Sequence, residues 1–240
     1  MNNNIPKTIL ITGATSGFGK ATAKLFNEKG WQTIITGRRA DRLEELAKEL
    51  GEKSLPLAFD ISDRRAVKSA IQNISPNFNN ISVLCNNAGL ALGLEGADNA
   101  NLDDWDQMID TNIKGLVYAT RAILPLMVEN GEGHIINLGS VAGSYPYPGG
   151  NVYGGTKAFV SQFSLNLRAD LETKEIDDEL ENMTKEKEDL ESAIKKMRVS
   201  IEDLNKEGRT RLLKAFDTVN SHFKDVFIKL FNGGKAHLEL

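Results

Sequence analysis

A glycine-rich turn near the N-terminus is the feature that most constrains the fold of this 240-residue chain. The apolar, strand-like run 8–12 leads into Gly13, Gly17 and Gly19, and a helical pattern then continues as far as Gly30. Glycines allow a tight turn and a close approach of the backbone to a pyrophosphate, and the N-terminus of the following helix attracts phosphate. The pattern predicts a dinucleotide-binding βαβ unit, with an ordinary strand-to-helix turn as the alternative.

The end of the second predicted strand indicates which dinucleotide would bind. Residues 31–36 form this strand, and Arg38 and Arg39 follow closely, with no carboxylate before Asp41. An acidic residue at this point holds the ribose 2′-hydroxyl of NAD, whereas an arginine suits the 2′-phosphate of NADP. We therefore predict NADP as the cofactor, with Arg38 on the phosphate. For Arg39 the favoured alternative is a capping role at the start of the next helix, predicted over residues 41–50.

Strands and helices alternate over the first 171 residues. The remaining predicted strands cover residues 54–60, 81–85 and 134–137, and helices are expected after a cap at Ser62 and from about Asp103. This alternation favours an α/β fold, a Rossmann-type doubly wound parallel sheet with right-handed crossovers. Ligands bind such sheets at the carboxyl ends of the strands. In this sequence those ends carry Gly13, Gly37, Asp60, Asn86 and Ser140.

Two side chains four residues apart, Tyr153 and Lys157, form the main candidate for proton transfer. On a helix they lie on one face, and a nearby ammonium favours the phenolate form of a tyrosine. Such a pair also occurs by chance on solvated helix faces, so its neighbours matter. Ser140 precedes the pair at a strand end, and Asn112 lies within an apolar helical pattern, where a polar side chain needs hydrogen-bond partners.

Composition argues against several other classes of protein. The formal net charge of −4 and the pI near 5.5 give no basis for a nucleic-acid or anionic-membrane partner. Cys85 is the single cysteine, which rules out an intramolecular disulfide, and no cluster of metal-ligand residues surrounds it. The N-terminus lacks the pattern of a signal peptide, and no apolar run approaches ~18 residues. We expect a cytoplasmic protein without a metal site.

Residues 7–171 resemble the short-chain dehydrogenase/reductase family. The resemblance rests on six features in the order of that family: the run from Thr12 to Gly19, Asp60, the run from Asn86 to Gly89, Asn112, Ser140, and the pair Tyr153 and Lys157. Three stretches, residues 87–93, 108–118 and 150–159, are similar more narrowly to the NADP-dependent 3-hydroxy acid (serine) dehydrogenases of the family.

The resemblance implies an NADP-dependent oxidoreductase that moves a hydride between the cofactor and a small hydroxy acid or its carbonyl form. Tyr153 would be the general acid/base, and Lys157 would support the tyrosine and hold the nicotinamide ribose. Ser140 would hydrogen-bond the developing alkoxide, as in an oxyanion hole. Asn112 would fix the active-site helix and hold a relay water.

The resemblance also implies a set of cofactor contacts. The glycines of the turn would face the pyrophosphate, Asp60 the adenine and Asn87 the adenine-side ribose. The full implied set is Gly13, Ser16, Gly17, Phe18, Gly19, Arg38, Asp60, Asn87, Ala88, Gly89, Tyr153 and Lys157.

The sequence changes character near Leu171. All six prolines and 18 of the 21 glycines lie before residue 172, whereas residues 172–240 carry 29 of the 62 charged side chains. Apolar residues then recur at spacings of four and three, interrupted by Lys187, which is the heptad pattern of a coiled-coil strand. A single solvated helix with salt bridges is the alternative. The apolar positions are Ile176, Leu180, Met183, Leu190, Ile194, Met197, Ile201 and Leu204.

Gly208 is predicted to break this helix. A second amphipathic helix is expected over residues 212–231, with a C-cap at Asn232–Gly234 and a short strand over residues 236–240. Residues 172–240 as a whole resemble the distal coiled coil and head-lobe entry of SMC (structural maintenance of chromosomes) ATPases, without any ATPase motif.

We therefore predict two domains, residues 1–171 and 172–240. The first is a Rossmann domain truncated after its fifth strand and the following helix, so the family's sixth and seventh strands and substrate lid are missing. The second is a coiled-coil-like helical extension, and a homo-oligomer is expected. Two functions remain open: a dehydrogenase acting on a small hydroxy acid or carbonyl substrate, or a non-enzymatic fusion protein that self-associates or binds a partner through its coiled coil.

Overall fold

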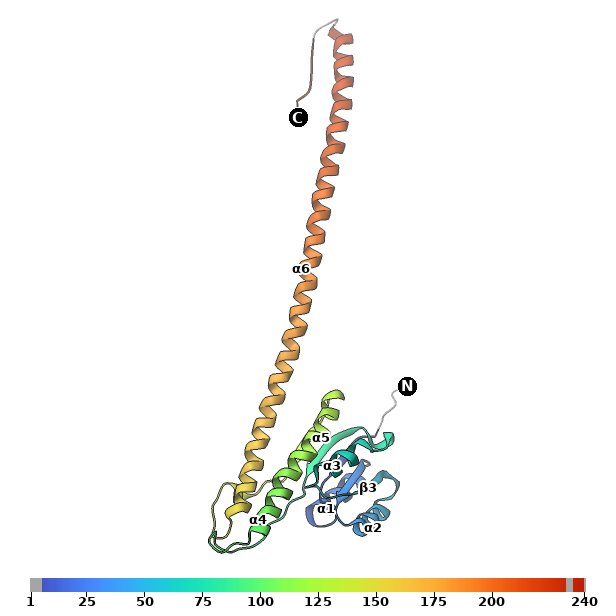
Figure 1. Cartoon of the computed structure of the whole chain (residues 1–240). Helices are drawn as coiled ribbons and strands as arrows, with labels where there is room; N and C mark the ends of the chain where they lie inside the picture. Colours follow the sequence, from blue (N-terminus) through green and yellow to red (C-terminus); the bar gives the residue numbers. More distant parts are fainter. Residues whose placement is uncertain (1–5, 232–234, 240) are drawn as a thin grey trace. The chain divides into compact units, whose positions relative to one another are not determined.

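The computed structural model describes residues 6–231 and 235–239 (Figure 1). The chain divides into two units, residues 1–169 and 170–240, each of which is described by itself. Among the described helices, none is both long enough and apolar enough to cross a membrane.

Five parallel strands form the sheet of the first unit, which confirms the predicted Rossmann-type fold. The strand order is β3-β2-β1-β4-β5, so β5 lies at one edge. The order reverses beside β1, and a doubly wound sheet opens its ligand crevice at such a reversal. The strands are β1 (Thr8–Ile11), β2 (Gln32–Gly37), β3 (Ser54–Ala58), β4 (Ile81–Asn86) and β5 (His134–Asn137).

Helices follow most strands, as the alternating pattern predicts. Single-turn 3₁₀ segments lie at Gly51–Lys53, Pro76–Phe78 and Val141–Gly143, and a π-helical segment, η3, spans Asp110–Gly115. The α-helices are α1 (Gly17–Glu28), α2 (Ala40–Leu50), α3 (Arg64–Gln72), α4 (Leu102–Ile109), α5 (Leu116–Glu129) and α6 (Asn151–Phe231).

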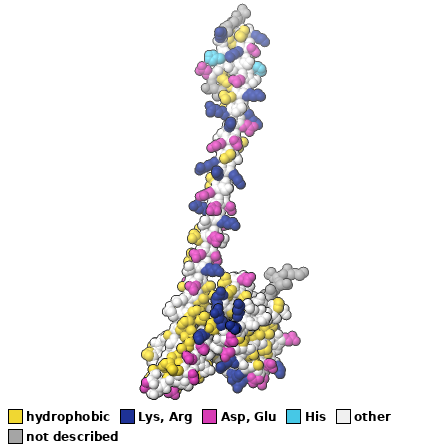
Figure 2. All heavy atoms as spheres, in the orientation of Figure 1, with side chains coloured by type: hydrophobic (Ala, Val, Ile, Leu, Met, Phe, Trp, Pro, Cys, Tyr) yellow, Lys and Arg dark blue, Asp and Glu magenta, His cyan; other side chains and the backbone are white. Residues whose placement is uncertain are grey.

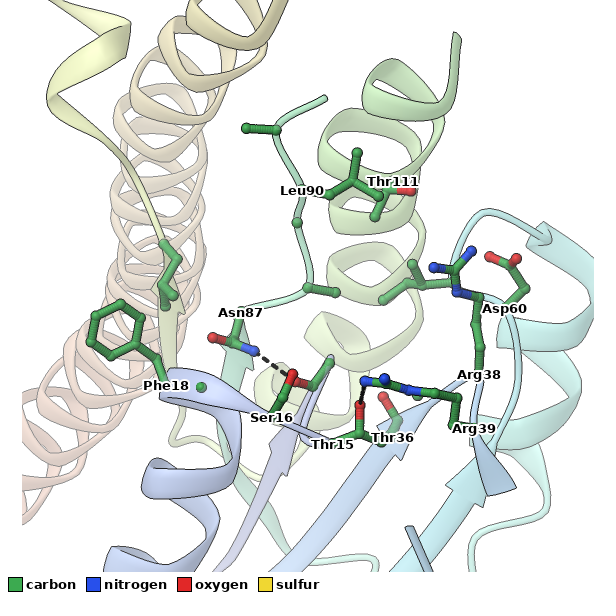
Figure 3. Close-up of a pocket in the computed structure, with 18 of the residues that line it drawn as sticks. Thr15, Ser16, Phe18, Thr36, Arg38, Arg39, Asp60, Asn87, Leu90 and Thr111 are labelled. Carbon is green, nitrogen blue, oxygen red and sulfur yellow. Dashed lines mark hydrogen bonds between the residues drawn. The ribbon is translucent and has the colours of Figure 1, made fainter. Parts of the chain in front are cut away.

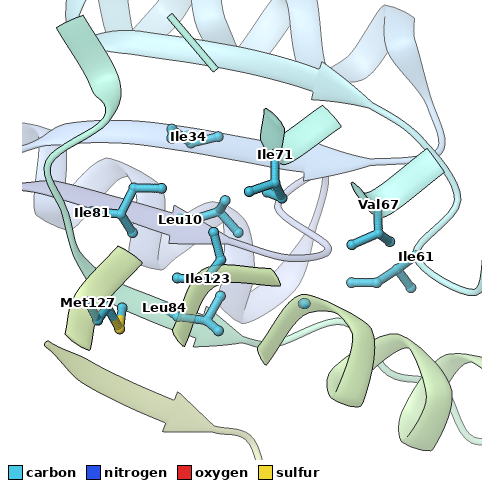
Figure 4. Close-up of a cluster of buried hydrophobic side chains, with 10 residues drawn as sticks. Leu10, Ile34, Ile61, Val67, Ile71, Ile81, Leu84, Ile123 and Met127 are labelled. Carbon is cyan, nitrogen blue, oxygen red and sulfur yellow. The ribbon is translucent and has the colours of Figure 1, made fainter. Parts of the chain in front are cut away.

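The core lies on both faces of the sheet because successive strand residues point to opposite sides. Ile9 and Ile11 of β1 pack with residues of α1 and α2. Leu10, between them, packs with residues of α3 and α5, as the cluster in Figure 4 shows. All three side chains are at most 1% exposed. The cores on the two faces hold β1 rigidly, and the glycine turn follows directly after it.

Two predicted helix features are wrong in detail. Asp63, not Ser62, caps α3: its Oδ1 accepts from the backbone N–H groups of Arg65 at 2.8 Å and Ala66 at 3.1 Å. A carboxylate also complements the positive end of the helix dipole, which favours aspartate over serine there. The helix predicted from about Asp103 does not run uninterrupted, because η3 divides it into α4 and α5.

The predicted break at Gly208 is also wrong, because α6 continues through it as far as Phe231 (Figure 1). A glycine inside a helix costs only about 1 kcal/mol relative to alanine. No proline lies in α6 to remove a hydrogen bond, and strong helix formers flank Gly208 on both sides. The predicted charged helix and second amphipathic helix are therefore one element.

The predicted C-terminal strand does not form within residues 235–239. A strand needs a neighbouring strand for its backbone groups, whereas here the backbone N–H of Leu238 donates to the side-chain Oδ1 of Asn220 in α6 at 2.8 Å. The predicted C-cap at Asn232–Gly234 lies outside the described residues.

Candidate active site

A cavity of about 710 Å³ lies where the carboxyl ends of β1, β2 and β4 meet the first turns of α1 and α6. The side chains labelled in Figure 3 come from the glycine turn and the start of α1, the end of β2, the loops after β3 and β4, and η3. Its lining comprises Gly13, Thr15, Ser16, Gly17, Phe18, Thr36, Gly37, Arg38, Arg39, Phe59, Asp60, Ile61, Asn87, Ala88, Gly89, Leu90, Ala91, Thr111, Leu138, Gly139, Tyr153 and Lys157.

The three glycines of the turn have three different surroundings. Gly13 has φ +68°, and a Cβ on it would lie 2.9 Å from the Cα of Ala88. Gly17 has φ +54° and open space where its Cβ would stand, which suits the approach of a ligand. Gly19 is buried, and its Cβ would lie 2.4 Å from Asn87 Nδ2 and 2.5 Å from the Gly13 carbonyl oxygen. Gly19 is not in the cavity lining, and its role is to let α1 pack against the loop after β4.

Thr12 and Asn87 hold that loop against the glycine turn. The Thr12 Oγ1 accepts from the backbone N–H groups of Asn87 at 3.1 Å and Ala88 at 2.9 Å. The Asn87 Nδ2 donates to the carbonyl oxygens of Thr12 at 2.8 Å and Gly13 at 3.0 Å. In this structure the Asn87 amide therefore positions the loop. For Thr12 the sequence indicates only its place in the motif.

Two arginines line one end of the cavity, directly after the carboxyl end of β2. Arg38 and Arg39 are both exposed, and Arg39 Nη2 donates to Thr15 Oγ1 at 2.6 Å. Arg39 does occupy the N-cap position of α2, as expected, but its side chain makes no capping bond and turns to the cavity instead. Asp60 stands at the same end (Figure 3), where its Oδ1 accepts from the backbone N–H of Ser62 at 2.9 Å and from its hydroxyl at 2.7 Å.

The pair Tyr153 and Lys157 stands at the other end, on the first turns of α6. The Lys157 Nζ donates to the carbonyl oxygen of Leu138 at 2.7 Å and lies 5.9 Å from the centre of the Tyr153 ring. Lys157 is 7% exposed, and burial lowers its pKa because a desolvated ammonium is less stable. The predicted geometry, with phenol and ammonium on one helix face, is present.

Asn112 lies in η3 and makes the hydrogen bonds that its buried position requires. Its Oδ1 accepts from the Leu90 backbone N–H at 2.8 Å, and its Nδ2 donates to the Leu90 carbonyl at 2.8 Å and to Thr156 Oγ1 at 3.1 Å. A Cβ on Gly89 would lie 3.2 Å from this Oδ1. π-Helical turns are frequent at functional sites, and in this one a single amide joins the cavity loop to α6.

Ser140 lies beside the cavity but is not part of its lining. Its Oγ accepts from the backbone N–H of Ala142 at 3.2 Å and caps the 3₁₀ turn at Val141–Gly143. Of the four predicted catalytic residues, Tyr153 and Lys157 form part of the cavity wall, while Ser140 and Asn112 do not. Thr15, Leu90 and Thr111 also line the cavity, although the sequence did not single them out. Threonine and leucine are common in all parts of a fold, so their residue types do not indicate a place in a site.

The burial of Lys157 predicts a pH dependence of stability. Its folded pKa lies below the ordinary value of 10.5, so between those two values the unfolded chain binds more protons than the folded chain. Stability contributed by this residue therefore rises with pH across that window. We expect the free energy of unfolding in urea to increase for wild type relative to Lys157→Met as the pH rises toward 10.5.

Lys48→Met, at an exposed position of α2, is the control for loss of a lysine charge. A difference between wild type and Lys157→Met that stays constant over this pH range would contradict the expectation.

Comparison with known proteins adds evidence on the family. The family model described as short chain dehydrogenase matches residues 7–178. A "Probable NADP-dependent dehydrogenase" of Haemophilus influenzae is 61% identical over 164 residues, which cover 68% of this chain and 65% of that protein. "Serine 3-dehydrogenase" of Rhizobium radiobacter is 57% identical over 167 residues, covering 70% and 67%. The chain thus spans about two thirds of the length of these relatives.

Solved structures give the same result. The structure of serine dehydrogenase from Escherichia coli matches with a TM-score of 0.67 and 55% identity, over 68% of this chain and 76% of that one. The structure titled as the closed form of serine dehydrogenase complexed with NADP+ matches with a TM-score of 0.68 and 55% identity, over 68% and 66%. From its sequence match and its fold, the chain belongs to the short-chain dehydrogenase family.

Proposed function

We propose that the first unit binds NADP(H) and transfers a hydride between this cofactor and a small hydroxy acid or its carbonyl form. The observation that carries the proposal is one continuous cavity, with the glycine turn on its wall, two arginines at one end and the pair Tyr153 and Lys157 at the other. Its volume, about 710 Å³, lies within the roughly 300–1,000 Å³ usual for ligand pockets.

The residues present fit a dinucleotide. Gly17 leaves open space beside the N-terminus of α1, which is where a pyrophosphate finds backbone N–H donors and the positive end of the helix dipole. Arg38 and Arg39 supply two cations at the β2 end of the cavity, which suit a ribose 2′-phosphate. The Asp60 carboxylate already accepts two hydrogen bonds from Ser62. This charge pattern supports NADP(H) over NAD(H).

The proton chemistry belongs to Tyr153. When bound, the nicotinamide would accept a hydride from the substrate carbon or donate one to it. As the hydroxyl is oxidised, Tyr153 takes its proton, and in reduction the phenol returns a proton to the carbonyl oxygen. Lys157 places its ammonium 5.9 Å from the centre of the phenol ring. We propose Ser140 as a donor to the developing alkoxide, because its Oγ accepts from the Ala142 backbone N–H and its own O–H stays available to donate.

The substrate class rests on the relatives. Several relatives at 56–58% identity carry the name "NADP-dependent 3-hydroxy acid dehydrogenase YdfG", and the Rhizobium relative is named for serine. We expect purified chain to reduce NADP+ in the presence of L-serine or 3-hydroxyisobutyrate, followed through the absorbance of NADPH. If the chain binds NADPH but oxidises neither compound, the proposed hydride transfer is contradicted. The proposed binding of the cofactor would still stand.

The variant Arg38→Ala tests the proposed binding of the NADP(H) 2′-phosphate. Charge-assisted hydrogen bonds to a phosphate contribute enough that we expect NADPH affinity to fall roughly 10-fold to 100-fold, with NADH affinity unchanged. Fluorescence titration with NADPH and NADH in parallel gives both values. Arg42→Ala, an exposed arginine one turn further along α2, is the matched control. Equal affinity of wild type for the two cofactors would contradict the assignment of Arg38.

A further inference from the structure

The middle of α6 presents an apolar seam to solvent. Between residues 172 and 207, here called the heptad segment, eight apolar side chains recur at spacings of four and three along a continuous helix. Each is between 48% and 67% exposed. A helix that buries no face by itself gains its stability from a partner with a matching seam. The eight are Ile176, Leu180, Met183, Leu190, Ile194, Met197, Ile201 and Leu204.

The seam ends at a definite point. Apolar residues resume after Gly208 with the same spacing but displaced by one residue, so they do not continue the same face of the helix. Gly208 occupies the next seam position and has no side chain to contribute. One pairing surface therefore extends over the heptad segment. The displaced apolar residues are Leu212, Phe216, Val219, Phe223, Val226 and Leu230.

Side chains of both charge signs alternate along the face of the helix seen in Figure 2. The charges that lie beside the seam decide how two copies can pair. In a parallel, in-register coiled coil, each g residue faces the e residue five positions later on the other helix. Glu172 would then face Asp177 of the second copy, and Glu186 would face Glu191. Symmetry doubles both contacts, which gives four repulsions and no attractive pair.

Lys187, the one polar residue in the seam of the heptad segment, also disfavours a parallel pairing. Lys187 occupies an a position, so a parallel pairing would set it against Lys187 of the second copy. In the structure its ammonium lies 3.9 Å from Glu191 of the same helix, beside the seam. In an antiparallel pairing a positions face d positions, and the stem of Lys187 would meet an apolar side chain while its ammonium stays at Glu191.

Reversing one helix also separates the acidic flanks. The flanking positions in the first half of the heptad segment are mostly acidic, whereas in the second half they include Ala193, Arg198 and Ser200. An antiparallel arrangement sets the acidic half of each copy against this less acidic half. We propose that the heptad segments of two copies of this chain pair as an antiparallel two-stranded coiled coil.

Disulfide trapping in the full chain tests the pairing and its direction. Cys85 is buried and would be replaced by alanine, so that introduced cysteines report alone. Three single variants are prepared in this background: Leu180→Cys, Met197→Cys and Leu204→Cys. In the antiparallel pairing, position 180 faces position 197 or 204 of the second copy. We expect a disulfide dimer when the Leu180→Cys variant is mixed with one of the other two under mild oxidation, and none from Leu180→Cys or Leu204→Cys alone.

Two results would overturn the proposal. Disulfide dimers from Leu180→Cys alone and from Leu204→Cys alone would show a parallel pairing, and no disulfide in any mixture would show that the segments do not pair. The introduced cysteines all lie in the heptad segment, so association of two chains through their first units alone would not produce the expected disulfide.

A second pair of variants tests whether pairing depends on the seam itself or on exposed apolar side chains anywhere on the helix. Ile194 lies in the seam and is 48% exposed, whereas Val199 lies outside it and is 53% exposed. We expect Ile194→Glu to lower the yield of the mixed disulfide at least about tenfold, because a carboxylate would be buried in the seam. Val199→Glu should leave the yield unchanged. Equal losses from both variants would overturn the proposal.

Discussion

Replacing Tyr153 with phenylalanine is expected to lower the turnover number by roughly 10²-fold to 10⁴-fold, the contribution usual for a general acid/base. The substitution removes only the hydroxyl, so the ring keeps its place near Lys157, whose Nζ lies 5.9 Å from the ring centre. Affinity for NADPH should therefore change little. Steady-state kinetics with L-serine or 3-hydroxyisobutyrate, together with a fluorescence titration of NADPH, separate these two effects.

Tyr147→Phe is the matched control. Tyr147 lies in the loop before α6, is 42% exposed and is not part of the cavity lining. It should retain the turnover of wild type. A Tyr153→Phe variant with nearly wild-type turnover would show that another group transfers the proton, whatever its effect on binding.

Replacing Gly19 with alanine is expected to destabilise the chain, although the same change inside a helix ordinarily stabilises it. The new Cβ would lie 2.4 Å from Asn87 Nδ2 and 2.5 Å from the Gly13 carbonyl oxygen. The Asn87 amide must then move, which breaks its bonds to the carbonyls of Thr12 and Gly13. Overpacking together with lost hydrogen bonds costs about 2–4 kcal/mol. Urea unfolding measures the loss, and NADPH affinity should fall with it.

Gly155→Ala supplies the comparison, because Gly155 is also a helical glycine and has open space where its Cβ would stand. This variant should gain about 0.5–1 kcal/mol. If the two alanine variants have the same unfolding free energy, the close packing of Gly19 is not what holds the loop after β4 in place.

The sheet could be predicted because its signals are local and repeated. Each parallel strand is a short apolar run, and Ile9, Leu10 and Ile11 fill both cores in turn. Gly13 and Gly17 could be located for the same reason, since positions with positive φ leave little choice of residue. Tyr153 and Lys157 lie on one helix face, as their spacing predicts, and both line the cavity, but the prediction of a catalytic pair also needed their neighbours in the sequence.

Other features depend on contacts between distant segments, which the sequence does not display. Asn112 was recognised as needing partners, but nothing in its neighbours reveals that these are Leu90 and Thr156. The turn of Arg39 toward Thr15 depends on how β2 lies beside β1. Ser140 makes a local capping bond, so a hydroxyl at a strand end does not by itself reveal which way it points.

The errors after residue 171 have a different cause. Gly208 predicts a helix stop only when it is considered by itself, because a single glycine with no following proline leaves the helix the better choice. The strand-like run over residues 236–240 predicts a strand from the local sequence alone, whereas a strand forms only beside a neighbour whose backbone completes its hydrogen bonds.

The two ends of the cavity differ in how dissolved salt reaches them. Arg38 and Arg39 are exposed, and mobile ions screen charges in solvent over about 8–10 Å at physiological ionic strength. Lys157 is buried and donates to the carbonyl oxygen of Leu138 at 2.7 Å, and charges that are buried are screened much less by dissolved ions. Ionic strength should therefore act more strongly on the proposed capture of the cofactor than on the proposed proton transfer. The fold leaves the two arginines in solvent and buries the ammonium near the Tyr153 ring.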